Sequence, residues 1–417
     1  MHPHSVLFLF FFGFHFLCNG QNGYRTGTMH PDIKTLRISN ESDPHQLPLL
    51  ELGSGRQLEI SFDELASDPD RIAYRIVHCD AEWMPSRISE MEYLDGFNNN
   101  PVEEITPAFN TFTPYYHYSV RLPDDRVNFK LSGNYAVLFY KEDSPDEVIA
   151  TACFSVYENG IRIRGGVTTN TDIDFNKAHQ QLSLTLNWEK TPVSNPALDL
   201  KLKVTQNNRR DTEITLKTPS RLGVKEAIYE HNRNLIFEAG NNFRRFEIVS
   251  NKYRGMGVDN IRYLAPLYHV TLTPDQERSN RNYYYDQDQN GRYVIRQSEA
   301  TDNDTEADYY MVHFALDYNN PLIEGTIYLN GDFTYGRFDD AARMIYNFDT
   351  RRFEQSLLLK QGHYNYQYLF VPINGSRGSA SLIEGNYFET ENEYLIKAYY
   401  RPVGERYDRL VGIALIK

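Results

Sequence analysis

Apolar and polar side chains alternate with a period of two along most of this chain. Two such runs are Leu182, Leu184, Leu186 and Trp188, and Leu198, Leu200, Leu202 and Val204. This alternation is typical of strands that pack one face on a core and leave the other in water. The segment 135–140 is apolar on both faces, which predicts a strand in the middle of a sheet.

Helical periodicity is nearly absent, and turn-forming clusters at 207–211, 330–332 and 374–375 separate the alternating runs. The pattern therefore predicts an all-β chain of two to three tandem β-sandwich domains, of the immunoglobulin-like or early-set-like type. No repeat of fixed period is present, which disfavours a propeller or a solenoid.

We expect the sandwich domains at residues 21–158, 159–298 and 299–417, with a signal peptide at 1–20. The last boundary is suggested by the segment 299–308, which holds five acidic residues and no basic one. We interpret this segment as a solvated linker or a long loop.

The N-terminal stretch Val6 to Leu17 is apolar and has the length of a signal-peptide core. It is too short for a membrane-spanning helix, and no later run approaches the roughly 20 residues needed. Small residues at positions 18 and 20 predict that the exported chain begins at Gln21. A lipoprotein acylated on Cys18 is the alternative, although Leu17 and His15 occupy positions where small residues belong.

Composition narrows the function classes further. The chain of 417 residues has 31 Tyr and 24 Phe, an aromatic content that argues against disorder. It has 56 acidic against 43 Lys and Arg residues, a formal net charge of −13. Phosphate backbones repel so acidic a surface, so we expect no nucleic-acid partner.

Cys79 and Cys153 are the two cysteines outside the leader. An exported chain permits a disulfide between them. Both lie in apolar, strand-like sequence, however, which favours two separate buried thiols.

Glu389, Glu391 and Glu393 are the sharpest catalytic candidates. On a strand, a spacing of two places all three carboxylates on one face, and a pair of carboxylates is what glycoside hydrolysis requires. Nothing else supports this reading, because nucleophile elbow, phosphate-binding loop, dinucleotide fingerprint and metal-ligand spacings are all missing. We therefore expect no enzyme, with no catalytic, cofactor or metal-binding residues.

Three further patterns have a functional and a structural reading. Asp286 to Gly291 matches the first half of a calcium loop, but position twelve is Gln297, so a hairpin turn at Asn290-Gly291 is favoured. The Arg pairs 209–210, 244–245 and 351–352 are interpreted as solvated turns rather than a basic groove. Tyr364, Tyr366 and Tyr368 share one strand face, which fits a sugar- or protein-binding platform and a sandwich core equally well.

The C-terminal third also contains a set of segments that together resemble a known family. They are GTIYLNGDF (325–333), Met344 to Asn347, LLLKQGHYNYQY (357–368), IEGNYFETENEY (383–394) and AYYRP (398–402). Upstream, HCDAEW (78–83), EYLDGF (92–97) and GNYAVLFY (133–140) fit the same pattern. The chain thereby resembles the type IX secretion system plug protein family over nearly its whole length after the leader.

This resemblance implies a non-catalytic periplasmic protein at the inner face of the outer membrane. Its partner there would be the translocon barrel of type IX secretion, whose periplasmic end it occludes. The family supplies no catalytic residues, and the residues that contact the barrel stay unassigned. Residues 299–417 also resemble glycogen-binding-type modules, which makes glycan binding the alternative function. The tryptophans that such modules use are missing there, because Trp83 and Trp188 lie elsewhere.

Overall fold

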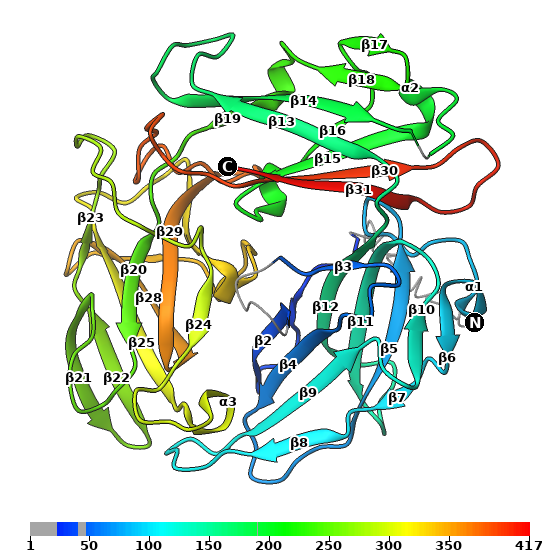
Figure 1. The fold of residues 1–417 in the computed structure, drawn as a ribbon. Coiled ribbons are helices and arrows are strands. Elements are labelled where there is room, and N and C mark those ends of the chain that lie inside the picture. The colour runs from blue at the N-terminus through cyan, green and yellow to red at the C-terminus, as the bar shows by residue number, and fades with distance from the viewer. Residues whose placement is uncertain (1–22, 41–46, 190) are drawn as a thin grey trace, which may run out of the picture.

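The computed structural model describes residues 23–40, 47–189 and 191–417, which fold almost entirely into strands. The all-β prediction is confirmed. The strands form three lobes around a common centre (Figure 1). The signal peptide at 1–20 and the start at Gln21 lie outside the described residues. Within the described ranges, no helix is long and apolar enough to cross a membrane.

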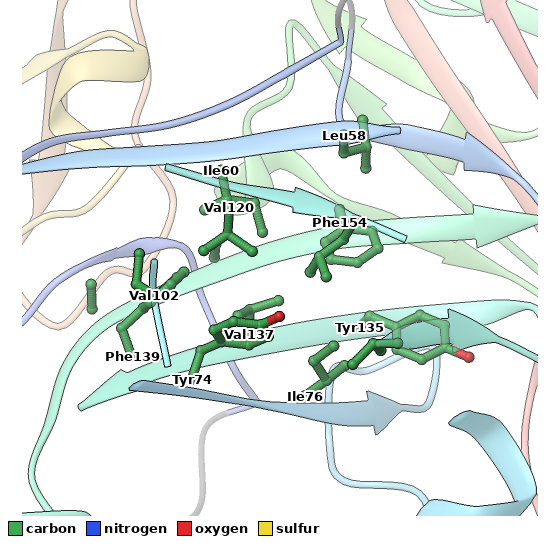
Figure 2. Close-up of a cluster of buried hydrophobic side chains, with 14 of the residues drawn as sticks. Leu58, Ile60, Tyr74, Ile76, Val102, Val120, Tyr135, Val137, Phe139 and Phe154 are labelled. Atoms are coloured by element: carbon green, nitrogen blue, oxygen red, sulfur yellow. The ribbon is translucent and has the colours of Figure 1, made fainter. Parts of the chain in front are cut away.

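The first lobe is a sandwich of two main sheets. Its elements are β1 (Gly27–Thr28), β2 (Ile33–Asn40), β3 (Leu49–Glu51), β4 (Leu58–Glu64), β5 (Ile72–Cys79), α1 (Glu90–Tyr93), β6 (Leu94–Gly96), β7 (Asn100–Pro101), β8 (Glu104–Pro107), β9 (Tyr116–Leu122), β10 (Val127–Phe129), β11 (Gly133–Lys141) and β12 (Val148–Tyr157). One sheet has the order β1-β12-β11-β5-β7, and the other β2-β4-β9-β8. Side chains such as Ile60, Val120 and Val137 fill the space between them (Figure 2).

The second lobe combines strands from two distant parts of the chain. Its elements are β13 (Arg162–Thr168), β14 (His179–Asn187), α2 (Pro196–Asp199), β15 (Leu200–Gln206), η1 (Arg210–Thr212), β16 (Ile214–Leu216), β17 (Arg221–Gly223), β18 (Glu226–Tyr229), η2 (Arg233–Leu235), β19 (Ile236–Glu238), β30 (Tyr394–Tyr400) and β31 (Arg409–Ile416). The sheet β13-β14-β18-β17 packs on the sheet β16-β15-β30-β31. Leu184, Leu202 and Ile396 belong to the core they share.

The third lobe lies between these two parts in the sequence. Its elements are β20 (Arg244–Ile248), β21 (Val258–Leu264), β22 (Leu267–Leu272), β23 (Asp275–Gln276), β24 (Tyr293–Ile295), α3 (Asn303–Glu306), β25 (Tyr309–Asp317), β26 (Gly325–Asn330), η3 (Asp332–Thr334), β27 (Ile345–Asn347), β28 (Arg352–Lys360) and β29 (Gly362–Pro372). The sheet β20-β29-β24, extended by β26, faces the sheet β21-β22-β25-β28-β27. Phe246, Val312 and Tyr364 lie in the core between them.

The third lobe is thus inserted into the second, because β30 pairs with β15 across the whole intervening segment. This arrangement differs from the expected division at residues 298 and 299, which lies within the third lobe. The alternation in the sequence identifies each strand but not the strand with which it pairs.

The alternating runs themselves are strands. Leu182, Leu184 and Leu186 are buried on β14, and the two-sided run at 135–140 is in β11, an inner strand between β12 and β5. Leu198 departs from the pattern: it lies in α2 with 74% of its surface exposed, before β15 begins.

Candidate functional site

A cavity of about 230 Å³ lies where the three lobes meet. Trp83 and Cys153 line it from the first lobe, Lys203 and Arg210 from the second, and Asp332 from the third. A wider cavity of about 1030 Å³ adjoins it, and the two share the lining residues Leu47, Leu49, Asn290, Arg292 and Leu395. We call the smaller one the central cavity.

Basic side chains dominate the wall of the central cavity, in contrast to the net charge of −13 of the whole chain. The basic lining residues are Arg25, Arg37, Lys203, Arg209, Arg210, Arg292 and Lys397. The acidic ones are Glu213 and Asp332. Burial raises the pKa of Asp332 to about 6, so this carboxylate begins to lose its charge just below neutral pH.

Four of the cations have carboxylate partners; Lys203 is described below, and the other three are as follows. Arg37 on β2 pairs with Asp304 on α3, which joins the first lobe to the third. Arg292 lies 2.6 Å from Glu393, which joins the third lobe to the start of β30 in the second. Arg209 pairs with Asp211 at 2.6 Å and also donates to the carbonyl of Gly378. The first two pairs stabilise contacts between lobes, whereas Arg209 and Asp211 both belong to the second lobe.

Two other cations lie over the ring of Trp83 instead. The guanidinium carbon of Arg210 is 5.0 Å from the ring centre, and Nζ of Lys397 is 5.3 Å from it. Arg210 donates to the carbonyl of Tyr24 at 2.6 Å, and Lys397 donates to Oγ of Ser155 at 2.9 Å. Within the described ranges, neither has a carboxylate in ion-pair distance. Burial lowers the pKa of Arg210, and it lowers that of Lys397 to about 8.

Lys397 also faces a like charge across the sheet. It stands directly opposite Lys203 in the antiparallel pair β15–β30, where side chains are about 5 Å apart at Cβ and like charges repel. Lys203 is compensated by Glu213 at 3.1 Å and by Glu82 at 3.5 Å. Sequence reasoning missed this cluster; the lone basic residue in the buried strand Tyr394–Tyr400 was its only local signal.

A second buried charge centre lies between the first and third lobes. Asp63 on β4 accepts hydrogen bonds from Nζ of Lys360 at 2.5 Å, the hydroxyl of Tyr309 at 2.6 Å and Nδ1 of His117 at 2.7 Å. The side chains of Asp63 and Lys360 are both 1% exposed. Burial alone would raise the pKa of Asp63, but Lys360 and His117 hold it below its ordinary value. This centre ties β4 to β28.

The acidic segment 299–308 belongs to the same contact and is not a solvated linker. Asp308 is buried and accepts from the backbone amides of Phe112 at 2.8 Å and Thr113 at 3.0 Å in the first lobe. Asp304 pairs with Arg37. The expectation failed for Asp304 and Asp308 because these two acids have partners in another lobe, far away in the sequence, whereas Glu299 and Asp302 are exposed.

Glu389, Glu391 and Glu393 do not share a strand face. They lie in the loop before β30, where Glu389 and Glu391 are exposed. Glu393 is 8% exposed and is bound by Arg292 and by Lys417 at 2.8 Å. These three residues therefore lack the common strand face on which the glycosidase reading was based.

Tyr364, Tyr366 and Tyr368 are core residues, exposed by 3% or less. The hydroxyls of Tyr366 and Tyr368 each donate to Oδ2 of Asp275 at 2.7 Å. Arg244 pairs with the other oxygen of Asp275 at 2.8 Å. A sugar-binding platform at these three rings is excluded by their burial.

The Asp286–Gly291 segment ends in the expected turn, with positive φ at Asn290 and Gly291. Only one flank is a strand, β24, so the turn does not close a regular hairpin. The carboxylate of Asp288 accepts from the backbone amides of Phe243 and Asn290, which leaves it a structural role.

The prediction of unpaired cysteines is confirmed, since Cys79 and Cys153 are free and buried. They lie on β5 and β12, which flank β11. The prediction of solvated turns holds only in part for the Arg pairs. Arg351 is an exposed turn residue. In contrast, Arg244 is a buried side chain on β20, Arg210 lines the central cavity, and Arg352 on β28 pairs with Asp317 at 2.6 Å.

Asp80, Glu82 and Asp408 bring carboxylate oxygens within 4.8 Å of one another. Asp80 accepts from the amides of Glu82 and Met84, and Asp408 from that of Ala81, while Lys201 neutralises Glu82. The oxygens are therefore already used by the protein itself.

An exposed aromatic group spans the first and third lobes. Phe112, from the loop between β8 and β9, lies 5.5 Å from Tyr263 and 5.2 Å from Tyr268, measured between ring centres. Phe112 and Tyr263 are 55% and 49% exposed, and the neighbouring Leu264 is 55% exposed. Clusters of exposed aromatic side chains are typical of protein-binding surfaces.

Comparison with known proteins identifies relatives of this fold. Residues 33–158 match the family model described as type 9 secretion system plug protein, 1st domain. The crystal structure of a hypothetical protein from Parabacteroides merdae ATCC 43184 is 47% identical, with a TM-score of 0.93 over 95% of this chain and 99% of that one. Pseudomonas fluorescens alkylpurine DNA glycosylase AlkC, bound to DNA containing an abasic site analog, aligns over 30% of each chain at 11% identity. Its TM-score of 0.16 indicates no common fold. No curated protein matches the chain significantly.

Proposed function

Because this chain belongs to one family with the Parabacteroides merdae protein and carries a type 9 secretion system plug protein 1st domain at residues 33–158, we propose that it is a plug of that secretion system. In this role it occludes the periplasmic end of the outer-membrane translocon barrel and catalyses no reaction. The family match over 33–158 is the observation that carries the proposal.

The architecture supports the role of a stopper. A body that fills a pore must resist deformation, and here three lobes are fixed to one another by ion pairs such as Asp63–Lys360 and Arg292–Glu393. The insertion of the third lobe into the second adds two chain connections between them. Glycan binding remains the alternative through the resemblance of residues 299–417, but Tyr364, Tyr366 and Tyr368 cannot form its platform because they are buried.

The exposed aromatic group around Phe112 and Tyr263 is the surface that we assign to the barrel contact. The few side chains whose truncation costs about 2 kcal/mol or more of binding free energy are enriched in aromatic residues near the centre of an interface. The group also bridges two lobes, so a partner bound there contacts the first and third lobes together.

The experiment is a tagged pull-down from native outer membranes combined with a permeability assay. We expect the barrel to be captured with the wild-type chain, and less of it when secreted cargo is abundant, because cargo and plug compete for one pore. A deletion strain should become sensitive to vancomycin, and the full-length gene should restore resistance.

Variants locate the contact. Phe112→Ser combined with Tyr263→Ser should reduce barrel capture by about tenfold or more. The control is Ile323→Ser, which removes an even more exposed apolar side chain, 86% exposed, from a loop of the third lobe. Absence of the barrel from every pull-down, with unchanged permeability, would refute the plug proposal. Equal loss of capture in the control variant would refute only the assignment of the surface.

A further inference from the structure

The charges around Trp83 are unbalanced in a way that the plug role does not explain. Arg210 and Lys397 both lie over this ring, and each has one hydrogen bond to an uncharged oxygen. Arg25 lines the mouth of the same cavity as an exposed residue, and no ion pair of its side chain occurs in the described part of the chain. The other basic lining residues all have carboxylate partners.

Unpaired charges in a protein interior are costly, because the low dielectric does not replace the hydration they lose. Here the cost is increased by Lys203, which stands directly opposite Lys397 on β15. Glu213 is the acidic lining residue that acts electrostatically on Lys397 and Arg210, but its ion pair is with Lys203. The cluster therefore retains positive charge that a bound anion would neutralise.

We propose that the central cavity binds a small oxyanion of the phosphate or sulfate class, held by Lys397, Arg210 and Arg25. Guanidinium and ammonium groups are the donors that recognise such anions, and each offers several N–H groups of which Arg210 and Lys397 spend one on the protein. A cavity of about 230 Å³ accommodates several water molecules, and hence an ion of this size.

The anion would connect two lobes. Lys397 is on β30 and Arg210 on η1, both in the second lobe, whereas Arg25 and Trp83 belong to the first. An anion bound here neutralises the cations of the second lobe where they face the first lobe. We therefore expect binding to raise the thermal stability of the contact between the first and second lobes.

Lys397 makes the binding dependent on pH. Its neighbours are Glu213 and Lys203 from the β15 side, Arg210 from η1, and Cys153, Ser155 and Trp83 from the first lobe. Because burial lowers its pKa to about 8, Lys397 loses its charge as the pH rises through this value. Anion binding should weaken in the same range. The folded state without anion gains stability between about pH 8 and the ordinary lysine value of 10.5, since there the unfolded chain binds more protons.

The test measures the thermal unfolding midpoint of the exported chain, starting at residue 21, in sodium chloride and in sodium phosphate of equal ionic strength at pH 7. We expect a saturable rise with phosphate, of several degrees at a hundredfold excess over the dissociation constant. Sulfate should act similarly. Glycerol 3-phosphate distinguishes a site for the free ion from one that also accepts a phosphate ester.

Two variants decide whether the effect arises in the central cavity. Lys397→Met and Arg210→Gln should each remove most of the phosphate-dependent rise, and Lys252→Met, which removes an exposed lysine paired with Glu299, should leave it intact. In the wild type the phosphate-dependent rise in the unfolding midpoint should decline above pH 8, whereas the small rise that remains in Lys397→Met should not depend on pH in this range. Circular dichroism establishes that the variants fold, and calorimetric titration with phosphate gives a second reading. An unchanged midpoint in the wild type, or the same rise in both cavity variants, would overturn the proposal.

Discussion

Replacing Lys360 by methionine is expected to cost about 3–5 kcal/mol at the contact between the first and third lobes. The substitution leaves Asp63 1% exposed, hydrogen-bonded to His117 and to the hydroxyl of Tyr309, with Arg37 as a more distant cation and no lysine or arginine of the described residues in ion-pair distance. A carboxylate buried without its main counterion is among the most destabilising changes that a single substitution produces.

Hydrogen exchange at the amides of Phe112 and Thr113 is the most direct measurement, because both donate to Asp308 across this contact. Their exchange should accelerate by two orders of magnitude or more, as about 3 kcal/mol of lost stability implies. The double variant Asp63→Asn/Lys360→Met removes both charges, and its Phe112 and Thr113 amides should exchange more slowly than those of Lys360→Met alone. Lys252→Met, at an exposed pair, should change nothing measurable. Unchanged exchange in Lys360→Met would show that the pair does not hold the lobes together.

Replacing Glu384 by leucine should have an effect of similar size in the third lobe, about 3–5 kcal/mol. Glu384 is fully buried and receives Arg244 at 3.0 Å, Arg278 at 2.6 Å and the amide of Tyr368 at 2.9 Å. Its loss leaves two guanidinium groups short of a counterion inside the core. The measurement is the urea unfolding midpoint, with the exposed Glu405→Gln as control.

The pH dependence of this site has a definite sign. Burial by itself would raise the pKa of Glu384, but Arg244 and Arg278 hold it below the ordinary value of 4.5. Its contribution is complete above pH 4.5 and is lost as the pH falls through the lower value found in the folded state. The stability gap between wild type and Glu384→Gln should therefore narrow below about pH 4.5. A gap independent of pH would contradict the assigned role.

The sequence was sufficient to identify the strands but not their partners. The apolar alternation at 182–186 and the two-sided run at 135–140 depend on local packing, and both are strands in the structure. The pairing of β15 with β30 depends on contacts between residues almost two hundred positions apart, and no local pattern specifies such a choice. The third lobe's insertion into the second was therefore not visible in advance.

The surroundings of polar and charged side chains were predicted less well than the strands, for a related reason. A spacing of two places Tyr364, Tyr366 and Tyr368 on one face but does not say whether that face is buried. Arg210 occurs in a turn, as expected, yet the turn lies against Trp83 of another lobe. Whether a charged side chain is solvated or buried is decided by lobes that meet only in the folded molecule.

The inner position of β30 has a consequence for how the chain matures. This strand lies between β15 and β31 and supplies Ile396 and Ala398 to the core of the second lobe. When the chain is synthesised or exported from its N-terminus onward, β15 with its apolar residues Leu202 and Val204 has an unpaired edge until β30 is available, that is, until residue 400. The second lobe can complete its fold only after all residues of the third lobe have been synthesised or exported, because β30 follows them in the sequence. A chain that stops before β30 thus has an open sheet edge and a second lobe that cannot complete its fold, so we expect proteases to cleave it more readily. Only the chain that includes β30 forms all three lobes.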